Sequence, residues 1–238
     1  MILNKPYRLT KITKLTPEVS SFLFKADDGA VMDFVPGMFA MLQYKNEKTG
    51  ESVARAFSIA NAPPSNSLEF VIALIHGRFT SKLDTAAVGD LYYVSAPYGQ
   101  FKFDINEGDK FLFLAGGTGI APFISMLRQS AQTGNKSDAV MIYSTKFATE
   151  LIYHDELMEY EKTSKFKLAI TVTRPQPGDS FKGYEGHVNA EMIAKVAPDF
   201  KDRISYICGP PAFVKALKVA LESLGADPKK IRAEMWGE

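Results

Sequence analysis

Residues 110–126 read KFLFLAGGTGIAPFISM, and this stretch decides the fold of the second half of the chain. The apolar run stops at Gly116-Gly117-Thr118-Gly119 and resumes with helical spacing behind Pro122, which predicts a strand, a tight turn and a helix. Pro122 suits the first helical position because it has no N–H to leave unpaired. Glycines let the backbone approach a phosphate closely, and a helix N-terminus offers N–H groups to an anion. Close packing is the alternative reason for three glycines, whereas a P-loop is excluded because no Gly-Lys-Ser/Thr follows.

The composition describes a globular protein and excludes several classes. The 238 residues suffice for one large domain or two ordinary ones, and the net charge of +1 gives no general attraction to nucleic acid or anionic membranes. The single cysteine, Cys208, excludes an internal disulfide and an iron–sulfur cluster ligated by this chain alone. The three histidines are too scattered for a metal site. With neither a membrane span nor a secretory signal in the sequence, we expect a cytoplasmic protein.

Short β-branched and aromatic runs separated by turn residues fill the first half of the chain. Six strands without a convincing helix, except near residues 80–87, predict an antiparallel barrel or sandwich. The predicted strands cover residues 7–15, 20–26, 37–44, 55–61, 68–75 and 90–101.

The sequence pattern changes after Gly108-Asp109, where strand-like runs begin to alternate with helical segments. This alternation predicts a parallel sheet covered by helices on both faces. We therefore expect two domains, residues 1–105 and 106–238. The helices are predicted near residues 121–132, 149–162, 188–196 and 211–224. Ligands of such sheets bind at the carboxyl ends of the strands, here residues 116–118, 144–146 and 208–211.

Three motifs together carry a resemblance to a known family. Arg55-Ala56-Phe57-Ser58 lies in the first half, and GGTGIAPF and Cys208-Gly209-Pro210 lie in the second. Their order and spacing resemble the ferredoxin–NADP reductase superfamily over essentially the whole chain. The resemblance implies an antiparallel barrel that holds a flavin and an α/β domain that presents a nicotinamide cofactor to it.

The resemblance assigns the flavin to Arg55, Phe57 and Ser58. A guanidinium can clamp phosphate oxygens, an aromatic ring can stack on the flavin, and a hydroxyl can hydrogen-bond its reactive nitrogen. Phe57 stands where the family usually has tyrosine, so stacking is kept and the phenol contact is lost.

Gly77-Arg78-Phe79-Thr80 begins a stretch similar to the family's second phosphate motif. Thr80 is predicted to cap a short helix whose N–H groups, with Gly77 and Phe79, meet the flavin's pyrophosphate. The alternative is that Gly77 only closes a turn. Two phosphate sites favour FAD over FMN.

Gly117 and Thr118 are expected to approach the nicotinamide cofactor's pyrophosphate and ribose. By resemblance, Cys208 lies beside the nicotinamide ring, with Gly209 and Pro210 next to it. A lone buried cysteine is more often a small hydrophobic residue. We do not predict a nucleophile here, since the flavin carries the redox chemistry.

The C-terminal residues Glu234 and Trp236 resemble the family's terminal Glu-x-Tyr. Glu234 is then a carboxylate near the hydride path, and Trp236 a displaceable cover on the flavin. Alternatively, Trp236 packs the last strand onto the core.

Lys146 and Tyr153 follow the second parallel strand, where a basic group favours the 2′-phosphate of NADPH. Tyr153 resembles the tyrosine that stacks on adenine in NADPH-using relatives. NADH stays open, because Lys146 is equally compatible with a solvated surface charge.

The resemblance implies an FAD-dependent NAD(P)H oxidoreductase, expected as a monomer or homodimer, that passes electrons to a separate ferredoxin or flavodoxin. Ser58, Cys208 and Glu234 are the candidate catalytic residues. The alternatives are an electron-transfer subunit of a larger redox complex and a flavin reductase.

Overall fold

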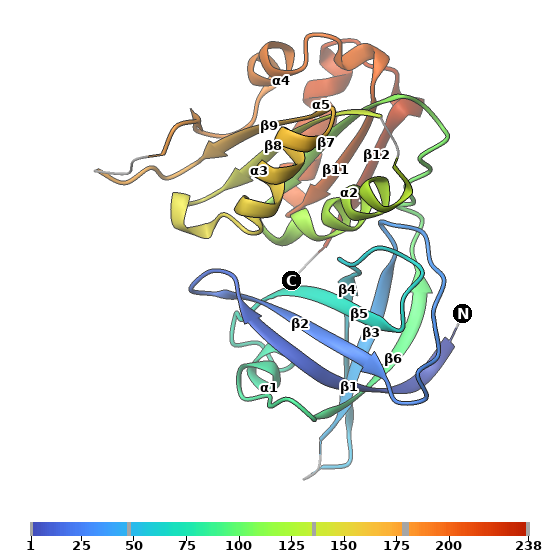
Figure 1. Cartoon of the computed structure of the whole chain (residues 1–238). Helices are drawn as coiled ribbons and strands as arrows, with labels where there is room; N and C mark the ends of the chain where they lie inside the picture. The colour runs from blue at the N-terminus through green and yellow to red at the C-terminus, as the bar shows by residue number, and fades with distance from the viewer. Residues whose placement is uncertain (1, 47–48, 135–136, 178–180, 237–238) are drawn as a thin grey trace. The chain divides into compact units, whose positions relative to one another are not determined.

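The computed structural model describes residues 2–46, 49–134, 137–177 and 181–236. The chain divides into two compact units. The first unit contains Met1–Phe103 together with Ala121–Gln129, and the second contains Asp104–Ile120 together with Ser130–Glu238. Each unit has its own β-sheet (Figure 1).

The first unit is an antiparallel half-barrel, which confirms the predicted class of this domain. Its strands pair in the order β4-β3-β6-β1-β2-β5. An isolated bridge between Ile59 and Phe70 links the chain after β4 to β5, so the sheet curls on itself. Buried aromatic rings such as Phe24 and Tyr92 fill its interior. The elements are β1 (Ile2–Lys14), β2 (Val19–Ala26), β3 (Phe39–Lys45), β4 (Ser52–Ser58), β5 (Ser67–Ala73), α1 (Thr80–Asp84) and β6 (Leu91–Tyr98).

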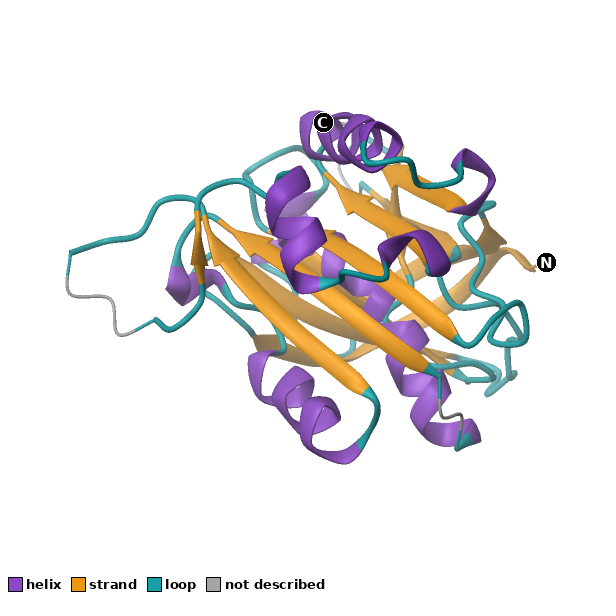
Figure 2. Ribbon diagram, turned by 90° about the horizontal axis from the view of Figure 1, so that it is seen from above, coloured by secondary structure: helices purple, strands orange, loops and turns teal. Residues whose placement is uncertain are grey.

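The second unit is a parallel α/β sheet with helices on both faces, as the sequence predicts (Figure 2). Its strand order is β10-β9-β8-β7-β11-β12. The strands are β7 (Lys110–Gly116), β8 (Asp138–Thr145), β9 (Phe166–Val172), β10 (Tyr184–Glu185), β11 (Ile204–Gly209) and β12 (Ile231–Met235). The helices are α2 (Ala121–Thr133), which also belongs in part to the first unit, α3 (His154–Thr163), α4 (Ala190–Val196) and α5 (Pro211–Ser223).

The order of the second sheet reverses between β7 and β11. The chain runs outward from β7 to β10 on one side and returns to β11 on the other. Such a switch point opens a crevice outside the carboxyl ends of the two strands, and ligands of this fold class bind there. β7 ends at Gly116 and β11 ends at Gly209, so two predicted site segments lie at the switch point.

Two local predictions need correction. The helix expected over residues 149–162 starts only at His154, because Tyr153 has a left-handed backbone with φ of 55° that no right-handed helix contains. Pro122 is the second helical residue, since α2 begins at Ala121, and the first turn tolerates a missing N–H at either position. None of the helices in the described ranges is both long and apolar enough to span a membrane.

Candidate functional site

The glycines of the turn after β7 serve two different purposes. A methyl group on Gly119 would lie 2.4 Å from the carbonyl oxygen of Cys208, and one on Gly116 would lie 3.1 Å from the Phe213 ring. Gly117 instead has a left-handed φ of 55°, and a methyl group there would meet nothing within 4 Å. Gly116 and Gly119 are therefore needed for packing, whereas Gly117 is free to approach a ligand.

The end of β11 packs directly against this turn. A methyl group on Gly209 would lie 3.2 Å from the Cα atom of Gly116 and 2.9 Å from the Phe213 ring. Pro210 is exposed and immediately precedes α5. Thr118 is partly exposed beside Gly117. The two strand ends thus form one tight edge whose accessible groups are Gly117, Thr118 and Pro210.

The Cys208 thiol is fully buried at this edge. Burial raises its pKa, the nearby Glu234 carboxylate raises it further, and the indole N–H of Trp236 donates a hydrogen bond to Sγ. A thiol with a raised pKa is neither a nucleophile nor a thiolate ligand at neutral pH. That Cys208 has no nucleophilic role stays a prediction.

Glu234 is a carboxyl group that titrates near neutral pH. It pairs in register with Cys208 through the parallel β11–β12 ladder. Partial burial raises its pKa to about 7, and it has no hydrogen bond or ion pair with any residue in the described part of the chain. Trp236, two residues later, keeps 42% of its surface exposed and so does not pack into the core. A partly buried carboxyl that can hold or release a proton at pH 7 is a functional candidate.

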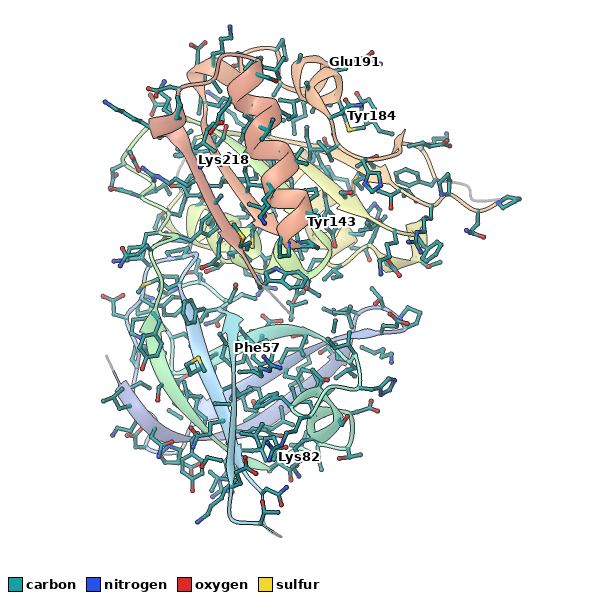
Figure 3. All side chains as sticks on the ribbon, turned by 180° about the vertical axis from the view of Figure 1, so that it is seen from behind. Phe57, Lys82, Tyr143, Tyr184, Glu191 and Lys218 are labelled. Carbon is teal, nitrogen blue, oxygen red and sulfur yellow. The ribbon has the colours of Figure 1, made fainter. Side chains whose placement is uncertain are left out.

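Lys146 and Tyr153 lie on the segment that follows β8. Lys146 is exposed. The buried Tyr143, labelled in Figure 3, accepts a hydrogen bond from the Ile152 N–H at 3.3 Å and so fixes the chain just before Tyr153. The left-handed backbone of Tyr153 costs conformational energy, and such outliers cluster at ligand sites.

Arg174 is a candidate that the sequence reasoning missed. Its backbone N–H donates to the carbonyl oxygen of Lys146 at 2.8 Å, so two exposed basic residues sit at the adjacent carboxyl ends of β8 and β9. Arg174 follows an apolar run just as Lys146 does, and the strand-end rule would have found it. Only the sheet order, however, makes the two residues neighbours.

Strand β4 holds the first three flavin candidates on an incompletely covered surface. The Arg55 side chain is exposed and makes no hydrogen bond or ion pair with any residue the structure describes. Phe57, labelled in Figure 3, is partly exposed, and its ring centroid lies 5.6 Å from that of Phe79 and 6.2 Å from that of Phe70. Ser58 ends the strand and is partly exposed. Strand alternation puts Arg55 and Phe57 on one face of β4 and Ser58 on the other.

The loop before α1 differs in detail from the predicted capping arrangement. Thr80 does not cap the helix: Phe79 occupies the cap position, and the Thr80 hydroxyl instead accepts a hydrogen bond from the Gly77 N–H at 2.9 Å. The loop is thereby closed on itself, with the preceding His76 in a left-handed conformation. Phe79 as a whole residue is only 2% exposed, so its ring is not available to stack on a ligand.

These groups fit a cofactor that carries phosphates. The N–H groups of Arg78, Phe79 and Thr80 make no hydrogen bond within the described ranges, and Arg55 carries an unpaired positive charge. Unpaired backbone donors and a free guanidinium are the donor set that phosphate oxygens require. In the second unit, the open Gly117 at a switch point fits a dinucleotide in the same way.

Comparison with known families agrees with this geometry. The oxidoreductase FAD-binding domain family matches residues 6–103, and the oxidoreductase NAD-binding domain family matches residues 113–218. The chain is 34% identical over 235 residues to a glycine betaine monooxygenase reductase subunit of Pseudomonas aeruginosa, covering 97% of this chain and 63% of that protein. It is 27% identical over 240 residues to the ferredoxin reductase component of a 3-ketosteroid-9-alpha-monooxygenase of Mycobacterium tuberculosis, covering 96% of this chain and 64% of the other. The chain therefore spans less than two thirds of the length of these relatives.

Solved structures share the fold of both units. The FAD/NAD-binding domain of a nitric oxide dioxygenase from Vibrio cholerae has a TM-score of 0.89 at 20% identity, with 100% of both chains covered. A ferredoxin NADP+ reductase from Neisseria gonorrhoeae, solved with bound FAD and NADP, has a TM-score of 0.81 at 22% identity, with 99% of both chains covered. Fold and site define a flavoprotein oxidoreductase with an FAD-binding and an NAD-binding domain. The chain belongs to the ferredoxin–NADP reductase superfamily.

Proposed function

We propose that this protein takes a hydride from NAD(P)H and passes the electrons to a separate carrier protein, such as a ferredoxin, a flavodoxin or an oxygenase component. The observation that carries the proposal is the pair of matched domains, FAD-binding over residues 6–103 and NAD-binding over residues 113–218. Relatives that are reductase components of monooxygenases support it. FAD, when bound, accepts electrons in a pair and releases them singly. One cysteine in these 238 residues cannot ligate an iron–sulfur cluster, so the proposal places the electron acceptor outside them.

The residues of the first unit hold and orient the flavin in this proposal. Arg55 and the free N–H groups of Arg78, Phe79 and Thr80 bind its pyrophosphate, since they supply charge and directed donors. Phe57 stacks on the ring system. The Ser58 hydroxyl hydrogen-bonds the reactive ring nitrogen and so fixes the orientation of the ring.

In this proposal, residues of the second unit bind the nicotinamide cofactor, and one of them holds or releases a proton. Gly117 and Thr118 approach its pyrophosphate and ribose, while Gly209 and Pro210 shape the edge next to Cys208. Glu234 holds or releases a proton at its carboxyl group, because its pKa lies near 7. Trp236 is the displaceable aromatic cover, and 42% of its surface is exposed.

A second candidate is an electron-transfer subunit that acts only within a larger redox complex. The name "reductase subunit" of a 34% identical relative favours it. We expect the protein in the cytoplasm, as an active monomer or homodimer. Size-exclusion chromatography with an activity assay separates the two candidates, because an obligate subunit is inactive or unstable alone.

The proposed function is tested with purified protein and FAD. We expect a yellow protein that binds FAD tightly and reduces ferricyanide with NADPH or NADH as the donor. Tight retention of FAD also argues against a flavin reductase that releases reduced flavin. Colourless protein without ferricyanide reduction after addition of FAD would overturn the proposal.

Preference for NADPH is proposed from the two basic residues at the ends of β8 and β9. Replacing both Lys146 and Arg174 with methionine should lower kcat/KM for NADPH about tenfold or more and leave NADH within about twofold, because only NADPH carries the 2′-phosphate. Stopped-flow reduction of the flavin by each donor measures this. Lys162→Met, on the exposed face of α3, is the control. Equal losses for both donors would contradict the preference.

A further inference from the structure

Helix α2 starts where the glycine turn ends, yet its residues Ala121–Gln129 belong to the first unit together with the barrel. The buried Phe123 ring contacts Phe101 with a centroid distance of 6.1 Å. Met126 is also buried, and its terminal methyl lies within 3.1 Å of a methyl group placed on Gly37. Apolar packing of this kind holds the helix but, being non-directional, fixes its rotation and axial position poorly.

Directed hydrogen bonds fix the rotation and axial position of α2 more firmly than these apolar contacts do. The fully buried Ser125 hydroxyl donates to the carbonyl oxygen of Asn61 at 2.8 Å. The Asn61 side chain is itself held at both ends: its oxygen accepts the Glu69 N–H at 2.8 Å, and its nitrogen donates to the Ser67 carbonyl at 2.9 Å. The acceptor that Ser125 uses is therefore fixed to β5.

Arg128 adds an ion pair one turn further along the helix. It donates to the Glu69 carboxylate at 2.5 Å and to the carbonyl oxygen of Ala60 at 3.2 Å. The other oxygen of that carboxylate accepts the Ser21 hydroxyl. The Arg128 and Glu69 side chains keep only 21% and 16% of their surface exposed, so water screens the pair weakly. We call Ser21, Asn61, Glu69, Ser125 and Arg128 the α2 latch.

The latch joins two segments that the proposed function uses. The carbonyl oxygens of Ala60 and Asn61, which accept the latch hydrogen bonds, lie two and three residues after Ser58, the last residue of the strand that carries the flavin residues. The other partner, α2, continues the turn that carries Gly117 and Thr118. Hydride transfer requires reacting atoms about 3–3.5 Å apart, and a 1 Å misplacement costs about 100-fold in rate.

We propose, on the basis of the proposed function, that Ser125 and Arg128 are positioning residues for hydride transfer. They touch neither cofactor in this proposal. They hold α2 in one rotation and axial position on the barrel, and the glycine turn that leads into α2 is held through the chain. Loss of the latch leaves flavin binding intact and slows the step that needs both cofactors.

The kinetic test compares Arg128→Met and Glu69→Gln with wild type in the FAD-loaded protein. We expect the limiting rate of flavin reduction to fall about tenfold to 100-fold, with FAD content and FAD affinity unchanged and little change in the half-saturating NAD(P)H concentration. Arg128→Lys should restore most of the rate, because it keeps the charge. The matched control is Arg8→Met, which breaks an exposed barrel ion pair with Asp27 and should change nothing.

Hydrogen exchange gives a readout that does not depend on turnover. Amides of residues 121–129 should exchange at least about tenfold faster in Arg128→Met than in wild type or Arg8→Met. An unchanged limiting rate, unchanged exchange, or a rate loss that only follows lost FAD would overturn the latch proposal. If neither NADPH nor NADH reduces the wild-type flavin, the proposed function itself fails and the latch proposal falls with it.

Discussion

The two ends of the parallel sheet differ in whether their charged side chains are paired. At the amino end, Arg203 is 5% exposed and donates to the carboxylates of Asp199 and Asp138, each at 2.7 Å, and to the Phe111 carbonyl at 3.2 Å. At the carboxyl end, neither Glu234 nor the Lys146 side chain has a partner in the described part of the chain. Paired charges lock one end of the sheet, whereas the unpaired groups at the other end are available to a ligand.

At the amino end of the sheet, the charged side chains form a connected network of ion pairs. Lys110 also bonds Asp199, at 2.9 Å, so one carboxylate serves two cations. Hydrogen bonds from Arg203 and then Lys110 lower the pKa of Asp199 to about 2 despite partial burial. These residues begin or precede β7, β8 and β11, and the network therefore joins three strands of the sheet.

Breaking the amino-end network should have the largest effect on stability. Arg203→Met leaves Asp138 and Asp199 without their buried partner, and we expect a loss of about 3–5 kcal/mol in the free energy of unfolding. Urea denaturation measures it. Lys110→Met, at a half-exposed position, is the control and should cost less than about 1 kcal/mol. Similar losses for both variants would contradict the central role of Arg203.

At the carboxyl end of the sheet, Gly119 is closely packed, whereas Gly117 has free space around it. Gly119→Ala should destabilise the protein by about 3 kcal/mol, because its methyl group collides with the backbone at Cys208. Gly117→Ala meets no atom and should cost only about 1 kcal/mol for the left-handed backbone. Thermal or urea unfolding of both variants checks the order. A larger loss for Gly117→Ala would reverse our assignment of the two glycines.

Glu234 should make stability fall as pH rises. Its native pKa of about 7 lies above the ordinary value of 4.5. Below pH 4.5 the carboxyl is protonated in both states and costs nothing. Between pH 4.5 and 7 the unfolded chain ionises first, so stability is lost, and above pH 7 the loss is complete.

Glu234→Gln removes this titration. We expect the variant to be more stable than wild type by about 2 kcal/mol above pH 7 and equally stable below pH 4.5. Urea denaturation across this pH range measures the difference. A constant difference at every pH would show that Glu234 does not titrate as described.

The smallest effect is expected at the C-terminal aromatic residue. Trp236→Phe keeps an aromatic ring and removes the N–H that donates to Cys208 Sγ. Because a single hydrogen bond to sulfur on a half-exposed ring contributes little, we expect a loss of about 0.5 kcal/mol. A loss above about 2 kcal/mol would instead show that Trp236 is part of the core.

A run of short strands predicted the antiparallel domain, and the alternation of strands and helices predicted the parallel one together with the segments at its strand ends. Local details were less predictable. The left-handed Tyr153 delays α3 to His154, and the Thr80 hydroxyl turns back to Gly77 rather than capping α1. Local pattern cannot show such reversals, because they depend on which backbone conformation the surrounding loop imposes.

The sequence by itself determined the two-domain architecture, because strand periodicity and glycine spacing express local chemistry, and its motifs carried the resemblance to the family. The tertiary structure alone decided which glycine is open, which basic residue joins Lys146, and that Arg128 bonds Glu69. These facts arise from contacts between segments far apart in the chain. Strand order and helix packing fix such contacts, and no periodicity in the sequence encodes them.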